Sequence, residues 1–279
     1  MKHTKKHNQY CLVINTAIKP SRQTKALHAI HKIFLAPYPL LAFAIFAVCL
    51  SLATPVLAMS VTPVAIDMTT SGRKARGQIT IVNDGTKQLP VEILVKRLEL
   101  DENGNKTTTP ANDDFYVTPV QTLIDPGATQ TIRLQWKGNA QIPSSQHYAF
   151  LVNQVPVTMP KGQSGVQVVF NFETIVNIAP PGGKASIQLL ETDIGKDSKG
   201  ITRPAVRVKN PGNSYAKLSD ATIKLSSGSW SKTLTPGYLR QSMGMGLLQA
   251  GKTRRILLPV DVPRGVRQIT ASIEYKPRK

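Results

Sequence analysis

Few residues in this sequence could carry out chemistry once the first 58 positions are set aside. His147 is the only histidine beyond them, and both cysteines, Cys11 and Cys49, lie within them. Nucleophilic catalysis needs a nucleophile, a base and a group that orients the base, and a zinc site needs several Cys or His ligands. We therefore expect His147 to be an ordinary surface or hydrogen-bonded histidine. We expect no enzyme activity, no metal site and no cofactor.

Acidic residues offer two further candidate sites. The run from Asp101 to Asn105 (DENGN) matches the first half of a calcium-binding loop, but Lys106 and Asn112 stand where that pattern has Gly and Glu. We interpret this run as a hairpin turn. Asp113 and Asp114 are neighbours, and neighbouring side chains of an extended chain point to opposite faces, so they do not form a carboxylate pair for acid–base catalysis.

The chain is strongly basic, with 35 Lys and Arg against 16 Asp and Glu and a formal net charge of +19. Seven of the basic residues and none of the acidic ones precede residue 59, so the remainder keeps about +12. Such a protein could meet nucleic acid, an anionic membrane surface or acidic proteins. The basic residues are scattered, few aromatic residues accompany them, and the run 252–255 reads as a solvated turn. We therefore expect no nucleic-acid partner.

Residues 1–58 predict a secretory signal peptide. A long basic region without acidic residues precedes the apolar run from Leu40 to Leu52, and Val56 to Ala58 resembles a cleavage site. The apolar run is too short to span a membrane, and no later run approaches that length. We expect an exported chain that starts near Met59, without an integral membrane segment or a disulfide. The true translation start stays open.

Alternating strand-like segments must position whatever functional residues the rest of the chain has. They recur about every 10–15 residues, separated by turn signals, and no long helical period interrupts them. This pattern predicts an all-β fold of two immunoglobulin-like β-sandwiches. The stretch PPGGK after Ala179 reads as a linker or corner, which places the domains at 59–180 and 181–279.

The longest strand signal is the stretch from Val166 to Ile178 (VQVVFNFETIVNI). Val166, Val168, Phe170 and Phe172 share one face of an extended chain, because side chains alternate with period two. Such a strand is about twice the usual length. A long apolar strand at a sheet edge is an aggregation hazard, so either it is central in a large sheet or its edge is there to be used. The residues alone leave both possibilities open.

At this point the chain resembles a known family. The block from Tyr148 to Pro156 (YAFLVNQVP), followed by a loop and the long strand, is similar to the PapD-like periplasmic pilus-assembly chaperones. The segment 171–180 (NFETIVNIAP) resembles their archaic branch. The resemblance implies two immunoglobulin-like domains in an L-shape, a periplasmic location, and binding of pilus subunits with delivery to an outer-membrane usher.

The resemblance also implies roles for individual residues. In the family, the long strand fills the gap in an incomplete subunit by β-augmentation, which makes Val166, Val168, Phe170 and Phe172 the donor residues. Arg133 matches a structural arginine that would hold the two domains through an acid of the second domain, and we expect that acid to be Asp261.

The sequence also departs from the best-known members of this family. They grip the subunit's C-terminal carboxylate with an arginine of the first strand and a lysine of the donor strand. Pro63 and Ile175 stand at those positions here, and neither can bind a carboxylate. The resemblance therefore leaves the basic anchor residue unidentified.

Two other function classes compete with a chaperone. One is an exported structural subunit or adhesin, which usually shows a single incomplete sandwich per unit, whereas this sequence has two complete sets of strands. The other is an exported enzyme or ligand-binding protein built on β-sandwiches, for which the residues offer no catalytic constellation.

Overall fold

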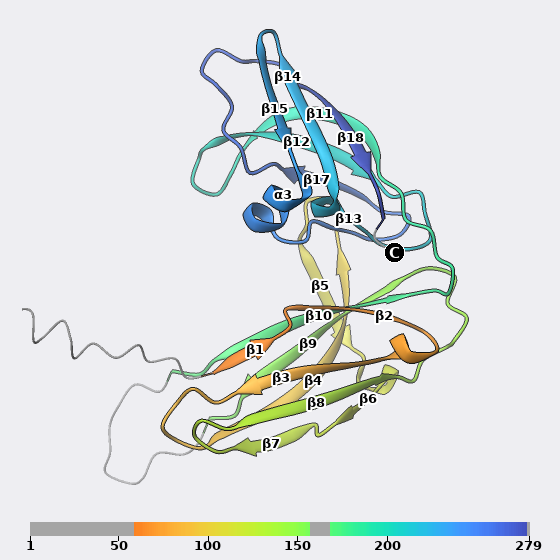
Figure 1. The fold of residues 1–279 in the computed structure, drawn as a ribbon, viewed down its shortest axis with the longest axis vertical. Helices are drawn as coiled ribbons and strands as arrows, with labels where there is room; N and C mark the ends of the chain where they lie inside the picture. The colour runs from red at the N-terminus through yellow and green to blue at the C-terminus, as the bar shows by residue number, and fades with distance from the viewer. Residues whose placement is uncertain (1–58, 157–167, 278–279) are drawn as a thin grey trace, which may run out of the picture. The chain divides into compact units, whose positions relative to one another are not determined.

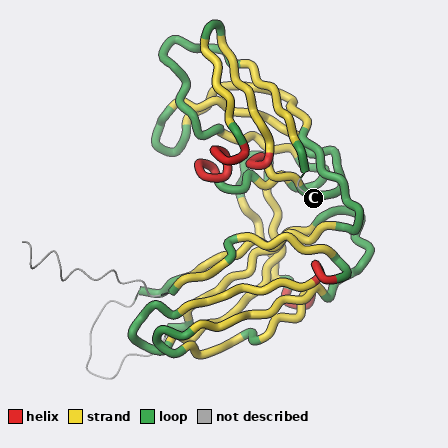
Figure 2. The backbone as a smooth tube through the Cα atoms, viewed as in Figure 1, coloured by secondary structure: helices red, strands yellow, loops and turns green. Residues whose placement is uncertain are grey.

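The computed structural model describes residues 59–156 and 168–277. This part of the chain is built almost entirely from β-strands, with one short α-helix, α3 (Pro236–Met243), among the described residues (Figures 1 and 2). The predicted all-β fold is confirmed. The described residues include no helix long and apolar enough to cross a membrane.

Two sheets form the first sandwich, and each has a simple order. One sheet runs β1-β3-β8-β6, and the other runs β2-β10-β9-β4-β5, with β7 also paired to β4. Their strands are β1 (Ser60–Thr62), β2 (Ala65–Thr69), β3 (Arg76–Val82), β4 (Leu89–Leu100), β5 (Lys106–Pro110), β6 (Phe115–Thr118), β7 (Gln121–Ile124), β8 (Thr129–Trp136), β9 (Gln146–Gln154) and β10 (Asn171–Ala179).

The core of the first sandwich lies between these sheets because their apolar side chains alternate with polar ones. Ile132, Leu134 and Trp136 point inward from β8, while Arg133 and Gln135 between them are exposed. Phe115 lies edge-on to the rings of Trp136, Tyr148 and Phe150, at centroid distances of 5.2, 4.9 and 4.9 Å. Edge-to-face packing of this kind adds to the free energy gained by burial.

The first strand of this sandwich is divided between the two sheets. β1 pairs antiparallel with β3, and β2 pairs parallel with β10. The chain changes sheet at Pro63 and Val64, which lie between the two strands. β2 therefore covers β10 only from the point where it enters the second sheet.

Three small sheets form the second sandwich, ordered β11-β12-β17, β13-β16 and β15-β14-β18, around a separate apolar core. Their strands are β11 (Gln188–Lys196), β12 (Thr202–Lys209), β13 (Ala216–Lys217), β14 (Ala221–Ser227), β15 (Trp230–Leu234), β16 (Leu247–Leu248), β17 (Thr253–Leu257) and β18 (Thr270–Tyr275). Along the sequence, the residues of the first core precede positions 180–183, and those of the second core follow them. The exact domain boundary stays a prediction.

The predicted strand from Val166 to Ile178 is corrected in its length. β10 begins at Asn171, and Val166 lies outside the described residues. Just before β10, the Phe170 amide donates to the side-chain Oε1 of Gln154, at 3.1 Å, instead of to a backbone carbonyl. The regular ladder therefore ends there, although the Gln154 amide still donates to the Phe170 carbonyl at 3.0 Å.

Candidate functional site

β10 has one fully paired edge and one edge that is only half covered. β9 pairs with it from Asn171 to Ile178, whereas β2 pairs only from Ile175 to Ala179 (Figure 1). The cover begins where the Ile175 amide donates to the Val64 carbonyl at 3.0 Å. Before that point, residues 171–174 have no strand partner on this side among the described residues. The structure thus contains an open sheet edge inside a strand whose other half is central.

The direction of the backbone groups on this edge follows from two hydrogen bonds. The Ile175 amide points toward β2, and the Phe170 carbonyl points toward β9. Because the backbone groups of alternate residues point to opposite edges of a strand, the N–H and C=O groups of Asn171 and Glu173 face the open edge. These four groups can accept another extended chain.

The face of the strand that holds the predicted donor residues changes gradually from buried to exposed. Val176 and Ile178 are fully buried in the core of the first sandwich, while Phe170 and Phe172 are half-buried against it. Val168 is 61% exposed. The core of the first sandwich is therefore continued by apolar side chains beside the open edge, where a partner could cover them.

The opposite face of β10 is more polar. Glu173 on this face forms an ion pair with Lys106 of β5. Ile175 lies opposite Ala65 of β2, so neither residue of this pair carries a charge. The same cross-strand row continues from Ile175 through Ala149 of β9 to Lys96 of β4. Lys96 is half-buried and forms no ion pair with any described residue.

Farther along the same face, His147 begins a chain of polar side chains. Its Nδ1 donates to Asn177 Oδ1 at 2.8 Å, and Asn177 Nδ2 donates to Asp67 Oδ1 at 3.0 Å. Asp67 in turn forms an ion pair with Lys217 of β13. Burial alone would raise the pKa of Asp67, but the hydrogen bonds from Lys217 and Asn177 lower it. This series of hydrogen-bonded and paired side chains connects the first sandwich to the second.

The expectation for His147 is wrong in part. The ring is hydrogen-bonded on one side, as expected, but it is not at the surface, because only 2% of the residue is exposed. Its Nε2 is buried and has no hydrogen-bond partner among the described residues. Burial lowers the pKa of His147 to about 4, against the opposing effect of the Asn177 hydrogen bond.

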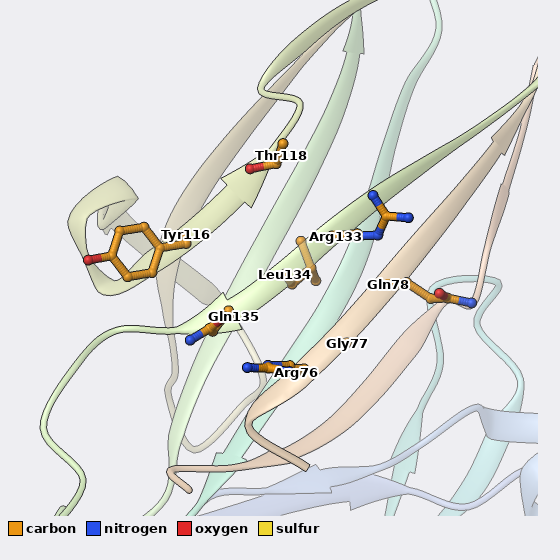
Figure 3. Close-up of a pocket in the computed structure, with 8 residues that line it drawn as sticks. All are labelled: Arg76, Gly77, Gln78, Tyr116, Thr118, Arg133, Leu134 and Gln135. Atoms are coloured by element: carbon orange, nitrogen blue, oxygen red, sulfur yellow. The ribbon is translucent and has the colours of Figure 1, made fainter. Parts of the chain in front are cut away.

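The predicted pair of Arg133 and Asp261 is not formed. Arg133 is exposed on the outer face of β8, between Gln78 of β3 and Thr118 of β6, because Ile132 and Leu134 occupy the inward positions. Figure 3 shows these outer side chains, which line a shallow pocket together with Arg76, Tyr116 and Gln135. Asp261 instead pairs with Arg203 of β12, within the second sandwich.

Residues 58–183 match a family model described as "Pili and flagellar-assembly chaperone, PapD N-terminal domain". This range covers both sheets of the first sandwich, including the open edge of β10. The first sandwich matches the N-terminal domain of the PapD-like pilus chaperones. Placement of the chain in the archaic branch stays a prediction, and no curated protein matches the chain.

Solved structures of chaperones are similar to this chain at low identity. The CsuC–CsuE complex from archaic Csu pili of Acinetobacter baumannii is 14% identical, over 77% of this chain and 98% of the other, with a TM-score of 0.48. The SafB chaperone with SafA pilin of Salmonella enterica is 14% identical, over 74% and 86%, with a TM-score of 0.49. The CupB2 chaperone of Pseudomonas aeruginosa is 14% identical, over 78% and 100%, with a TM-score of 0.43.

The residues that join the two sandwiches were missed by sequence reasoning. Gln249 donates to the Leu98 carbonyl at 3.0 Å and accepts from the Leu100 amide at 2.9 Å. Glu102 forms an ion pair with Arg207, and its carbonyl accepts from the Arg255 amide at 2.8 Å. No sequence signal could have found these contacts, because partners in both pairs lie more than a hundred positions apart.

The turn that half-matches a calcium loop belongs to this junction. It connects β4 to β5, so its interpretation as a hairpin turn is confirmed. The Asp101 carboxylate accepts the amide and the side-chain N–H of Asn105, at 2.8 and 2.7 Å. Gly104 has a φ of +88°, and a Cβ there would lie 2.3 Å from a guanidinium nitrogen of Arg254. The hydrogen bonds of the turn and its glycine therefore allow close packing against the second sandwich.

Proposed function

We propose that this protein is a periplasmic chaperone that binds pilus subunits by donor-strand complementation and delivers them to an outer-membrane usher. The single observation that carries this proposal is the open edge of β10 at residues 171–174. The match of residues 58–183 to the PapD N-terminal family model supports the chaperone class. The signal-like residues 1–58 support export.

The mechanism follows from the two properties of this edge. The free N–H and C=O groups of Asn171 and Glu173 would pair with a strand of the subunit, which provides affinity independent of its sequence. Val168, Phe170 and Phe172, with Val166 beyond the described residues, would enter the subunit's apolar groove. Fully burying one such side chain stabilises the complex by about 1.5–3 kcal/mol. Release would require only exchange with a competing strand, without a catalytic step or a nucleotide.

Lys96 is our candidate for the cation that binds the subunit's terminal carboxylate. Neighbouring strands lie about 4.8 Å apart, so Lys96 lies roughly 10 Å from Ile175, two strands away across the sheet. Its ammonium group is free of ion pairs among the described residues. A lone, half-buried ammonium favours an anionic partner. Pro63 and Ile175 cannot take this role.

An exported structural subunit or adhesin is the alternative. Such a subunit would need a gap in its own sandwich, whereas both sheets around the first core have their strands in place. This observation favours a protein that lends an edge over one that needs a strand. Fibres of the purified protein would instead support the alternative.

Co-expression with candidate pilus subunits, followed by a pull-down, tests the proposed function. Val168→Asp is the informative variant, because Val168 is 61% exposed and its change leaves the core untouched. We expect it to reduce subunit capture at least tenfold, since a charge would enter an apolar groove. Leu190→Asp is the matched control, because Leu190 is 43% exposed on β11 of the second sandwich.

The same assay tests the proposed anchor and sets the outcome that would refute the mechanism. Lys96→Met should weaken capture while keeping a side chain of similar length. Lys232→Met should not, because Lys232 is exposed on β15 of the second sandwich. Undiminished capture by both Val168→Asp and the double variant Phe170→Asp/Phe172→Asp would overturn the donor-strand proposal.

A further inference from the structure

His147 lies where the two sandwiches meet. It lies opposite Asn177 in the β9–β10 ladder, on the face turned away from the first core, since its neighbour Tyr148 points into that core. The ring of Tyr215, which precedes β13, packs edge-on against the imidazole at 5.7 Å between centroids. The second sandwich therefore contributes to the burial of this ring, and separation of the two sandwiches would return it to water.

The hydrogen bonds around His147 define which nitrogen carries the proton. Asn177 donates with its Nδ2 to Asp67, so its Oδ1 faces the imidazole and accepts the proton of Nδ1. Nε2 then holds a lone pair in a buried position, where no described residue forms a hydrogen bond with it. A proton added at Nε2 would bring both a positive charge and an unsatisfied N–H into this space.

The charged groups around the ring do not compensate for such a charge. Arg97 on β4 opposes it, and the Lys217 ammonium on β13 lies over the ring of Tyr215, at 5.7 Å. Among the described residues, Asp67 on β2 is the charged neighbour that favours it, but its carboxylate is already engaged by Lys217 and Asn177. Neutral His147 fits the closed junction, and protonated His147 does not.

We infer that His147 is an acid-sensitive lock between the two sandwiches: the neutral ring holds the junction closed, and its protonation favours separation. The chain from His147 through Asn177 and Asp67 to Lys217 transmits the effect from one sandwich to the other. This inference concerns the junction and does not depend on the proposed subunit binding.

The direction of the pH effect follows from linkage. The pKa of His147 is about 4 in the closed junction and would return toward 6.5 when the ring is exposed, so the open state binds more protons between these values. The contribution of neutral His147 to the stability of the closed state is fully present above about pH 6.5, and it is lost as the pH falls toward 4. Between pH 7 and pH 5, the ratio of open to closed molecules should rise about 20-fold.

Hydrogen exchange at three backbone amides can measure this opening directly. The amides of Ser145, Leu100 and Arg255 each donate across the junction, to Asn213 O, Gln249 Oε1 and Glu102 O at 2.9, 2.9 and 2.8 Å. In the full-length protein, we expect their protection factors, corrected for the intrinsic pH dependence, to fall about 20-fold between pH 7 and pH 5. Amides inside each core, such as those of Ile132 and Ile223, should not follow.

Two variants and one direct titration decide the outcome. His147→Phe keeps a ring against Tyr215 but cannot be protonated, so the fall in protection between pH 7 and pH 5 should disappear. Asp67→Asn should still show this fall, because protonation of Asp67 is not its cause. If His147→Phe does not fold, the ring of wild-type His147 is titrated by NMR. A pKa near 6.5 in the folded protein, or an unchanged pH response in His147→Phe, would overturn the inference.

Discussion

Single side chains join the two sandwiches through contacts that no local pattern in the sequence predicts. Gln249 is only 3% exposed, and its amide satisfies one donor and one acceptor of β4 that lie about 150 positions earlier in the chain. Arg133 shows the converse. Alternation along β8 predicts correctly that it points away from Ile132 and Leu134, but its partner could not be derived from that. Pairing between distant side chains depends on the packed tertiary structure.

Replacing Gln249 tests how much this one side chain contributes. Gln249→Leu keeps a similar volume but leaves the Leu98 carbonyl and the Leu100 amide without partners. An unsatisfied buried polar group costs about 1–3 kcal/mol, so we expect the free energy of unfolding to decrease by about that amount for each group left unpaired. Urea denaturation measures this change.

The matched control is Gln135→Leu, because Gln135 is exposed on β8 and a surface substitution usually changes stability by less than about 0.5 kcal/mol. Equal stabilities of Gln249→Leu and the wild type would mean that water replaces the lost amide at the junction.

At the scale of elements, alternation predicted which face of β10 is apolar but not where the strand would be paired. Phe170, Phe172, Val176 and Ile178 share a face, as their period-two spacing requires. The open edge depends instead on β2, which reaches β10 only after the chain changes sheet near Pro63. The chain changes sheet more than a hundred residues before β10, so no property of the β10 sequence predicts the open edge.

Proline substitutions can separate the two edges of β10. The Asn171 amide faces the open edge, so Asn171→Pro removes a group that the free protein does not use in its ladder. Proline is tolerated at such edge positions. The Phe172 amide faces β9, so Phe172→Pro removes a ladder bond. We expect Asn171→Pro to keep nearly wild-type thermal stability but to reduce subunit capture about tenfold, and Phe172→Pro to lower both.

Thermal melting and the subunit pull-down measure these two effects on the same preparations. Full capture by a stable Asn171→Pro variant would show that the client strand does not pair along this edge, and it would count against the proposed function without affecting the junction inference.

At the scale of the whole molecule, the composition gives the net charge but does not predict where the unpaired basic residues lie. Basic residues outnumber acidic ones by more than two to one. The outer face of β3, β8 and β6 carries Arg76 and Arg133 together with Lys137, whose ammonium lies 5.3 Å from the centre of the Tyr116 ring. None of these three cations forms an ion pair with a described residue. The excess charge is therefore available for long-range attraction.

This excess charge should guide acidic subunits toward the chaperone. Ionic screening shortens the reach of a charge from about 10 Å at 0.1 M salt to about 3 Å at 1 M. We expect the association rate constant with an acidic subunit to fall about tenfold over that range. The dissociation rate should change little, because apolar side chains and backbone hydrogen bonds hold the complex. Stopped-flow fluorescence can measure both rates. Arg133→Gln should flatten the salt dependence, and a salt-independent association rate in the wild type would exclude electrostatic guidance.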